Sequence, residues 1–222
     1  MFKKLLALFG KKTPATPAGP AVPSTPYKQD ELNLIYNLLF CDESTLYQPQ
    51  GTETALFGEQ ADAAVVRTIA EDVDEESRVR ILACNWLREN GHAVPAHELL
   101  GVIVEVPLDE GLDVLAAYAD GTVRYINQTG KFAVFEGAPD AVADSAKALV
   151  ETAKPALRQA TPAKGGRMPP PGPGHLRIGF LASDGLYFTQ GTFEVLAKDA
   201  RASSAIQSAQ TLLDLVVRQA SE

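Results

Sequence analysis

The sequence predicts an α+β fold, in which N-terminal helices are followed by an antiparallel sheet built from two β-β-β-α-like segments. Up to about residue 90, apolar residues recur at the three- and four-residue spacing of helices. Beyond residue 100 they form short runs separated by Asp-Gly turns, which is typical of antiparallel strands. A chain of 222 residues, 45% of them hydrophobic, can bury such a sheet without disulfides or metal ions.

The first predicted helix covers residues 29–41, where Leu32, Ile35 and Leu39 form one stripe and Asp30 is the candidate N-cap. Its length and periodicity favour a helix that buries one face. A second, shorter helix is predicted over residues 60–70.

The third predicted helix has the clearest boundaries. Asp74 is the candidate N-cap, Glu75 lies at the positive end of the helix, and Asn90-Gly91 is a stop signal. We therefore expect a helix of about four turns before the sheet begins.

The first β segment contains four predicted strands, at residues 101–106, 112–119, 122–126 and 131–136. Asp120-Gly121 favours a hairpin between the second and third strands, because both turn residues tolerate positive φ. A helix over residues 138–152 follows. The near-continuous apolar character of these strands predicts cover on both faces of the sheet, with the N-terminal helices as candidates for the second cover.

The second segment resembles the first. Strands are predicted at residues 176–182, 186–189 and 192–197, before a final helix over residues 200–219. The strings YADG and GKFAV of the first segment match ASDG and GTFEV of the second. A duplicated unit would place both C-terminal helices on one face of one sheet. Chance similarity of common hairpin residues is the alternative.

Proline-rich stretches divide the chain. Residues 1–26 are interpreted as a cationic amphipathic start followed by a Pro/Ala-rich tether, and residues 27–222 as one α+β domain. Within that domain we distinguish a helical part (27–99), a first β-meander plus helix (100–160), a Pro/Gly-rich crossover (161–174) and a second hairpin, strand and helix (175–222).

The charge distribution restricts the partners. Residues 1–27 hold four lysines and no acid, so the remaining 195 residues carry 16 basic and 28 acidic side chains, a net charge of −12. Such a body repels phosphate backbones, so we expect a protein partner, with a basic protein as one option, and not nucleic acid. Glu71, Asp72, Asp74 and Glu75 are candidate binding residues within an acidic run, whose other interpretation is a solvated helix start.

The first residues have the geometry of a cationic amphipathic helix. The candidate membrane-contact residues are Phe2, Lys3, Lys4, Leu5, Leu6 and Phe9. The apolar run is too short for a secretory signal, so we expect a cytoplasmic protein. Two alternatives stay open for this segment: a frayed or self-packed start, and weak peripheral contact with the inner membrane surface.

Most standard catalytic motifs are missing from the sequence. His97-Glu98 resembles the start of a zinc-protease motif, but Gly101 stands where the second histidine is needed. No Gly-x-Gly-x-x-Gly or Gly-x-Ser-x-Gly pattern occurs. Cys41 and Cys84 are interpreted as buried thiols. We therefore expect no catalytic residue, cofactor or metal ion.

One charged residue inside a strand is a further candidate. Arg124 lies in an apolar strand and needs an acceptor, for which Asp113 and Glu105 are the candidates across the sheet. The alternative acceptor is a carboxylate or phosphate of a ligand. Arg124 and the adjacent Tyr125 are therefore candidate binding residues.

Four stretches carry a resemblance to a known group of proteins. They are Leu38 to Asp42, Leu100 to Val106, Gly111 to Asp120, and Ser183 to Phe188. Together they resemble an uncharacterised family of soluble bacterial proteins, over most of residues 30–220. The resemblance implies a bacterial, soluble protein and no assigned activity or site.

These observations favour a non-enzymatic cytoplasmic protein-binding module over an enzyme. A narrower alternative is an immunity or neutraliser protein that binds a basic bacterial toxin, with acidic surface to speed association. A third is an enzyme with an unrecognised site near Arg124 and Tyr125 or in the loop from His92 to His97. A concave pocket that holds Arg124, Tyr125 or His97 among carboxylates would favour the enzyme.

Overall fold

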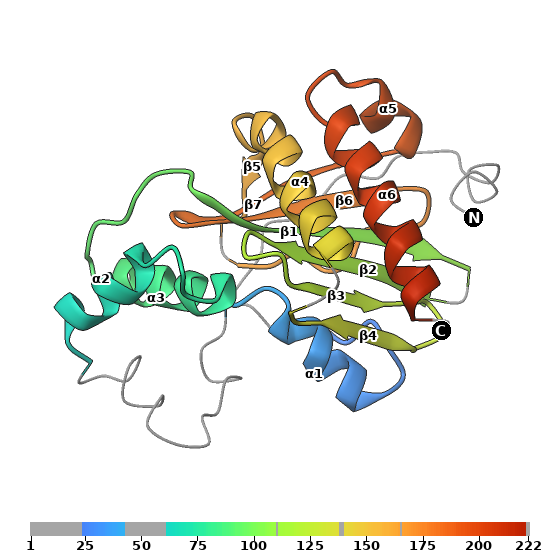
Figure 1. Cartoon of the computed structure of the whole chain (residues 1–222). Coiled ribbons are helices and arrows are strands. Elements are labelled where there is room, and N and C mark those ends of the chain that lie inside the picture. Colours follow the sequence, from blue (N-terminus) through green and yellow to red (C-terminus); the bar gives the residue numbers. More distant parts are fainter. Residues whose placement is uncertain (1–23, 43–60, 110, 138–139, 165, 221–222) are drawn as a thin grey trace.

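The computed structural model describes residues 24–42, 61–109, 111–137, 140–164 and 166–220, and it has the predicted α+β fold (Figure 1). One antiparallel sheet has the strand order β4-β3-β2-β1-β6-β7-β5. The strands are β1 (Leu99–Leu108), β2 (Gly111–Tyr118), β3 (Val123–Ile126), β4 (Phe132–Phe135), β5 (Thr161–Pro162), β6 (Leu176–Ala182) and β7 (Gly185–Gly191). Both β segments thus share one sheet, with β1 and β6 at its centre.

Helices cover both faces of the sheet. They are α1 (Asp30–Leu38), α2 (Ala63–Glu71), α3 (Ser77–Glu89), α4 (Asp140–Leu157), α5 (Phe193–Lys198) and α6 (Ser203–Gln219). Alternate residues of β1 project to opposite faces, so Val102 packs in the core under α4 and α6, whereas Ile103 packs in the core under α1 and α3. Figure 1 shows α4 and α6 side by side on one face. The sequence predicted this two-sided cover.

The termini of α3 agree only in part with the sequence. Its N-cap is Glu76, not Asp74, and Asp120 Oδ2 accepts a hydrogen bond from the Ser77 amide at 2.7 Å. A carboxylate from the β2–β3 turn thus satisfies one of the first amides of the helix, which have no acceptor within the helix. At the other end, the stop at Asn90-Gly91 is confirmed, since Gly91 has φ +76°.

The first helix also starts without the expected cap. Its N-cap is Gln29, whose side chain makes no capping bond, and Asp30 is instead the first helical residue. Asp30 and Glu31 in the first turn favour the helix through their charge.

The strand expected over residues 192–197 was a wrong prediction, because these residues form most of α5. Thr192 is the N-cap and its hydroxyl accepts from the Val195 amide, while Glu194 lies in the positively polarised first turn. These local signals outweigh the β-like string GTFEV. The second segment therefore differs from the first in its third element, although α4 and α6 pack in the same core.

Two glycines of the central strands provide a test of the packing. A Cβ at Gly101 would lie 2.9 Å from the ring of the fully buried Tyr118, whereas one at Gly179 would lie 3.7 Å from its nearest atom, the Ile103 oxygen. We expect Gly101→Ala to lower the free energy of unfolding by about 1–3 kcal/mol, and Gly179→Ala to be neutral or slightly stabilising. Urea denaturation measures both, and similar losses for the two variants would contradict the packing at Tyr118.

Candidate functional site

A buried carboxylate and a buried arginine face each other across the two central strands. Glu105 on β1 pairs with Arg177 on β6, and residues in direct register project from the same face. Glu105 Oε2 lies 3.6 Å from Arg177 Nη1, and their side chains are 0% and 8% exposed. The pair lies on the face covered by α1.

Polar groups of three other elements complete this pair. The Tyr36 hydroxyl on α1 donates a hydrogen bond to Glu105 Oε1 at 2.6 Å. Arg177 donates from Nε and Nη2 to Gln190 Oε1 on β7, at 3.0 and 2.8 Å, and from Nη1 to the Met168 carbonyl at 3.3 Å. The guanidinium is therefore oriented by β7 and by the crossover before β6.

Burial controls the electrostatics of Glu105. Loss of hydration raises the pKa of its carboxyl, an effect that Arg177, the Tyr36 hydrogen bond and Arg167 oppose. Burial and the nearby Glu105 carboxylate also raise the pKa of Tyr36, so its hydroxyl stays protonated and remains a donor. Among the described residues Glu105 Oε2 accepts no hydrogen bond, and its stabilisation depends on the charge of Arg177.

A second arginine reaches the site from the crossover. The Arg167 guanidinium carbon lies 4.7 Å from the centre of the Phe40 ring. Its Nε is 2.7 Å from Asp42 Oδ2, and its Nη1 donates to Asn37 Oδ1 at 2.7 Å. We call Asn37, Phe40 and Asp42 the guanidinium site. All three come from α1 or the residues after it.

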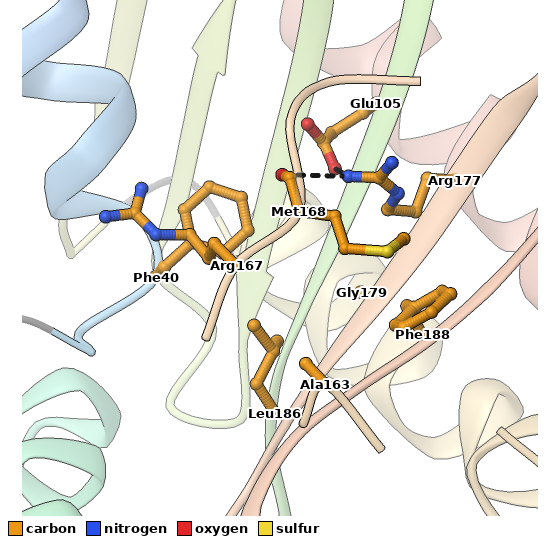
Figure 2. Close-up of a pocket in the computed structure, with 9 residues that line it drawn as sticks. All are labelled: Phe40, Glu105, Ala163, Arg167, Met168, Arg177, Gly179, Leu186 and Phe188. Carbon is orange, nitrogen blue, oxygen red and sulfur yellow. Dashed lines mark hydrogen bonds and ion pairs between the residues drawn. The ribbon is translucent and has the colours of Figure 1, made fainter. Parts of the chain in front are cut away.

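The two arginines border one small pocket, shown in Figure 2. It is lined by Phe40, Glu105, Ala163, Arg167, Met168, Arg177, Gly179, Leu186 and Phe188. The cavity measures about 10 Å³, which is near the lower limit for one water molecule. The cavity is therefore too small for an organic ligand. In this conformation Arg177 balances the charge of Glu105, and Arg167 that of Asp42.

Arg124 and Tyr125 do not form a common site, because adjacent residues of β3 project to opposite faces. Arg124 is buried and pairs with Glu136 beside β4. Tyr125 donates to Asp113 Oδ2 at 3.1 Å on the α4 side. A carboxylate across the sheet was the correct kind of partner for Arg124, but the predicted partners, Asp113 and Glu105, were wrong.

The acidic run lies at the end of α2 and in its connection to α3. Glu71, Asp72 and Asp74 are exposed, and Glu75 is half-buried. The candidate membrane-contact residues, Phe2 to Phe9, lie outside the described residues. Among the described helices, none combines the length and apolar character that crossing a bilayer requires.

His97 belongs to a separate polar cluster at the β6–β7 turn. Its Nδ1 lies 2.6 Å from Asp184 Oδ2, which also accepts from the Tyr187 hydroxyl at 3.2 Å. His97 has φ +56°, an uncommon conformation for a non-glycine residue. A pocket lined by His97 would have favoured an enzyme, but His97 does not line the pocket of Figure 2. Within the described ranges, His, Cys, Asp and Glu side chains form no group of three that could hold a metal ion.

The sequence analysis singled out Arg124, which does not line this pocket, and missed Arg177, Arg167 and Tyr36. The signal for Arg177 was present, since it is the one charged residue of the apolar strand β6, as Glu105 is of β1. Two lone charges of opposite sign in apolar strands predict a pair if the strands are neighbours. The strand order of the sheet makes β1 and β6 neighbours, and the sequence pattern does not predict that order. For Arg167 the sequence contains no comparable signal.

Comparison with protein-family models, curated proteins and solved structures found no match to this chain.

Proposed function

We propose that this chain is a non-enzymatic protein-binding module whose partner is a basic protein. The proposed contact is the acidic α2 surface, which we define as Glu71, Asp72, Val73, Asp74 and Glu75. The proposal rests on one observation: this surface has four carboxylates on either side of Val73 in the sequence, and Val73 is 77% exposed.

Two carboxylates of this surface accept hydrogen bonds from nearby backbone amides. Asp72 Oδ1 accepts from the Asp74 amide at 3.0 Å, and Glu75 Oε1 accepts from the Glu76 amide at 2.9 Å. Among the described residues, no arginine or lysine forms an ion pair with any of the four. Four like charges repel one another here, and a cationic partner would remove that repulsion.

The position of α2 also supports a docking role. Figure 1 shows α2 and α3 as a helical pair at one end of the molecule, away from α4 and α6. An exposed valine inside an acidic surface suits a partner with an apolar contact surrounded by basic residues. With a net charge of −12 outside residues 1–27, the chain would also accelerate the approach of such a partner.

The cellular setting in this proposal is the bacterial cytoplasm, with residues 2–9 as an optional contact to the inner membrane. A toxin-neutralising role is the narrower form, in which the basic partner is an enzyme that the module inhibits. Inhibition of the captured partner's activity would distinguish this form from other binding modules.

The proposal predicts that charge removal at this surface weakens partner binding. The variant Glu71→Gln, Asp72→Asn, Asp74→Asn, Glu75→Gln should bind at least about tenfold more weakly, because it loses four attractive interactions. The measurement is affinity capture from native lysate, followed by titration of the purified partner at low and high salt. Binding by the unchanged chain should weaken with salt, and the variant should lose most of this dependence.

A control variant removes the same number of charges from the opposite side of the protein. Asp144, Glu151, Glu194 and Asp214 are exposed residues of α4, α5 and α6. Their neutralisation lowers the net charge equally and should leave most of the binding intact. Equal losses for both variants, or a captured partner that is acidic, would contradict the proposed surface.

A further inference from the structure

The side chain of Arg167 is bound in the way that proteins bind an arginine ligand. A carboxylate faces its Nε, an amide oxygen accepts from its Nη1, and an aromatic ring lies against its guanidinium plane. This combination suits the planar fork of a guanidinium and suits an ammonium group poorly. Only 5% of the Arg167 side chain is exposed, so the guanidinium site encloses it.

The segment that carries Arg167 makes few hydrogen bonds elsewhere, although Pro171 within it is buried. Pro169, Pro170 and Pro171 follow it, and none of them has an amide hydrogen to donate. Across residues 167–171, the described hydrogen bonds to the rest of the protein are those of the Arg167 side chain and of the Met168 carbonyl, at 3.3 Å from Arg177 Nη1. This segment can therefore leave the sheet without breaking a ladder of backbone bonds.

Departure of Arg167 would also change the charge of the pocket. With Arg167 in place, two guanidinium groups face the carboxylates of Glu105 and Asp42. Without it, Glu105 and Asp42 each lose one guanidinium group that favours their charge, beside the rings of Phe40 and Phe188 that line the pocket. The vacated space would be anionic and aromatic, which is complementary to a guanidinium group.

We propose that the guanidinium site recognises an arginine side chain of a protein partner, and that Arg167 occupies it in the absence of that partner. The inference deepens the proposed function, on which it rests, because it assigns to the basic partner one specific residue type. The crossover then acts as an internal competitor. Since a tethered ligand acts at a high effective concentration, the partner's arginine must displace it, and removal of Arg167 should strengthen binding.

The experiment uses the full chain and a small probe, N-acetyl-arginine amide, with N-acetyl-lysine amide as its matched counterpart. Calorimetric titration should show that Arg167→Ala binds the arginine probe at least about tenfold more tightly than the unchanged chain does. It should also prefer the arginine probe to the lysine probe. Adding Asp42→Asn to Arg167→Ala should remove the gain, because the carboxylate that faces Nε is lost.

The control variant is Arg158→Ala, which removes an exposed arginine that does not contact the site. It should bind the probes as weakly as the unchanged chain. Arg167→Gln serves as a second variant, since its shorter polar side chain still fills part of the space. If neither Arg167 variant folds, or if both bind the two probes equally, Arg167 is a structural anchor and the inference is wrong.

This test is separate from that of the proposed function. The quadruple variant of the acidic α2 surface, combined with Arg167→Ala, should still bind the arginine probe while it loses the partner. Probe binding without any basic partner would refute the protein-binding role and leave the guanidinium site intact. A partner whose affinity is the same for Arg167→Ala and the unchanged chain would refute the internal competition alone.

Discussion

Replacing Arg177 by methionine is expected to lower the free energy of unfolding by about 3–5 kcal/mol. The change leaves Glu105, which is fully buried, without the charge of its ion-pair partner, while the Tyr36 hydrogen bond and the smaller effect of Arg167 remain. Methionine retains much of the arginine volume, so the expected loss reports the missing charge and not a cavity. Urea denaturation near neutral pH measures it.

Two comparisons separate this explanation from general damage to the sheet. Arg124→Met also removes a buried arginine from a strand, but its partner, Glu136, has a side chain that is 64% exposed and stays hydrated. We expect a cost of about 1 kcal/mol or less there. The double variant Glu105→Gln, Arg177→Met should regain most of the stability lost in Arg177→Met. A similar cost for both arginine variants would contradict the role of the buried pair.

The elements of the sheet were predictable because their signals are local. The strand at residues 176–182 was predicted with its observed boundaries, since an apolar run ends there at Asp184-Gly185. The boundaries of α4 differ more, because the helix predicted to end at residue 152 continues to Leu157, with Pro155 inside it. Pro155 lies in the last turn, so it removes one backbone hydrogen bond, the one to the carbonyl of Glu151, and the helix ends soon afterwards.

The candidate site was less predictable because it depends on strand order and on the crossover. Glu105 is the one charged residue of its strand, yet the prediction that it would pair with Arg124 assumed the wrong neighbouring strand. In the sheet, β2 separates β1 from β3, so Glu105 meets Arg177 of β6 instead. Periodicity gives the face on which a residue lies, but contacts between distant segments determine its partner. For Arg167, the proline-rich sequence indicated only a crossover.

The stability of the protein should fall as the pH rises through the titration of Glu105. Burial raises the pKa of this carboxyl in the folded state above its ordinary value of 4.5. Between the unfolded and folded pKa values, the folded protein keeps a proton that the unfolded chain has released. The folded state therefore binds more protons, and the free energy of unfolding decreases with pH, by at most about 1.4 kcal/mol per pH unit. The contribution is complete below the unfolded pKa and is lost above the folded one.

The variant Glu105→Gln isolates this effect, since Gln keeps an acceptor for the Tyr36 hydroxyl and cannot ionise. Asp113 and Glu76 also have raised pKa values, but both are unchanged in the variant, so their contributions cancel in the difference. Urea denaturation from about pH 4 to about pH 8 should show the unchanged chain losing stability relative to Glu105→Gln as the pH rises. The opposite trend would mean that attraction by Arg177 exceeds the cost of burial, and that Glu105 is held in its charged form. In that case Arg177→Met would be most destabilising at high pH, which the same titration of that variant would reveal.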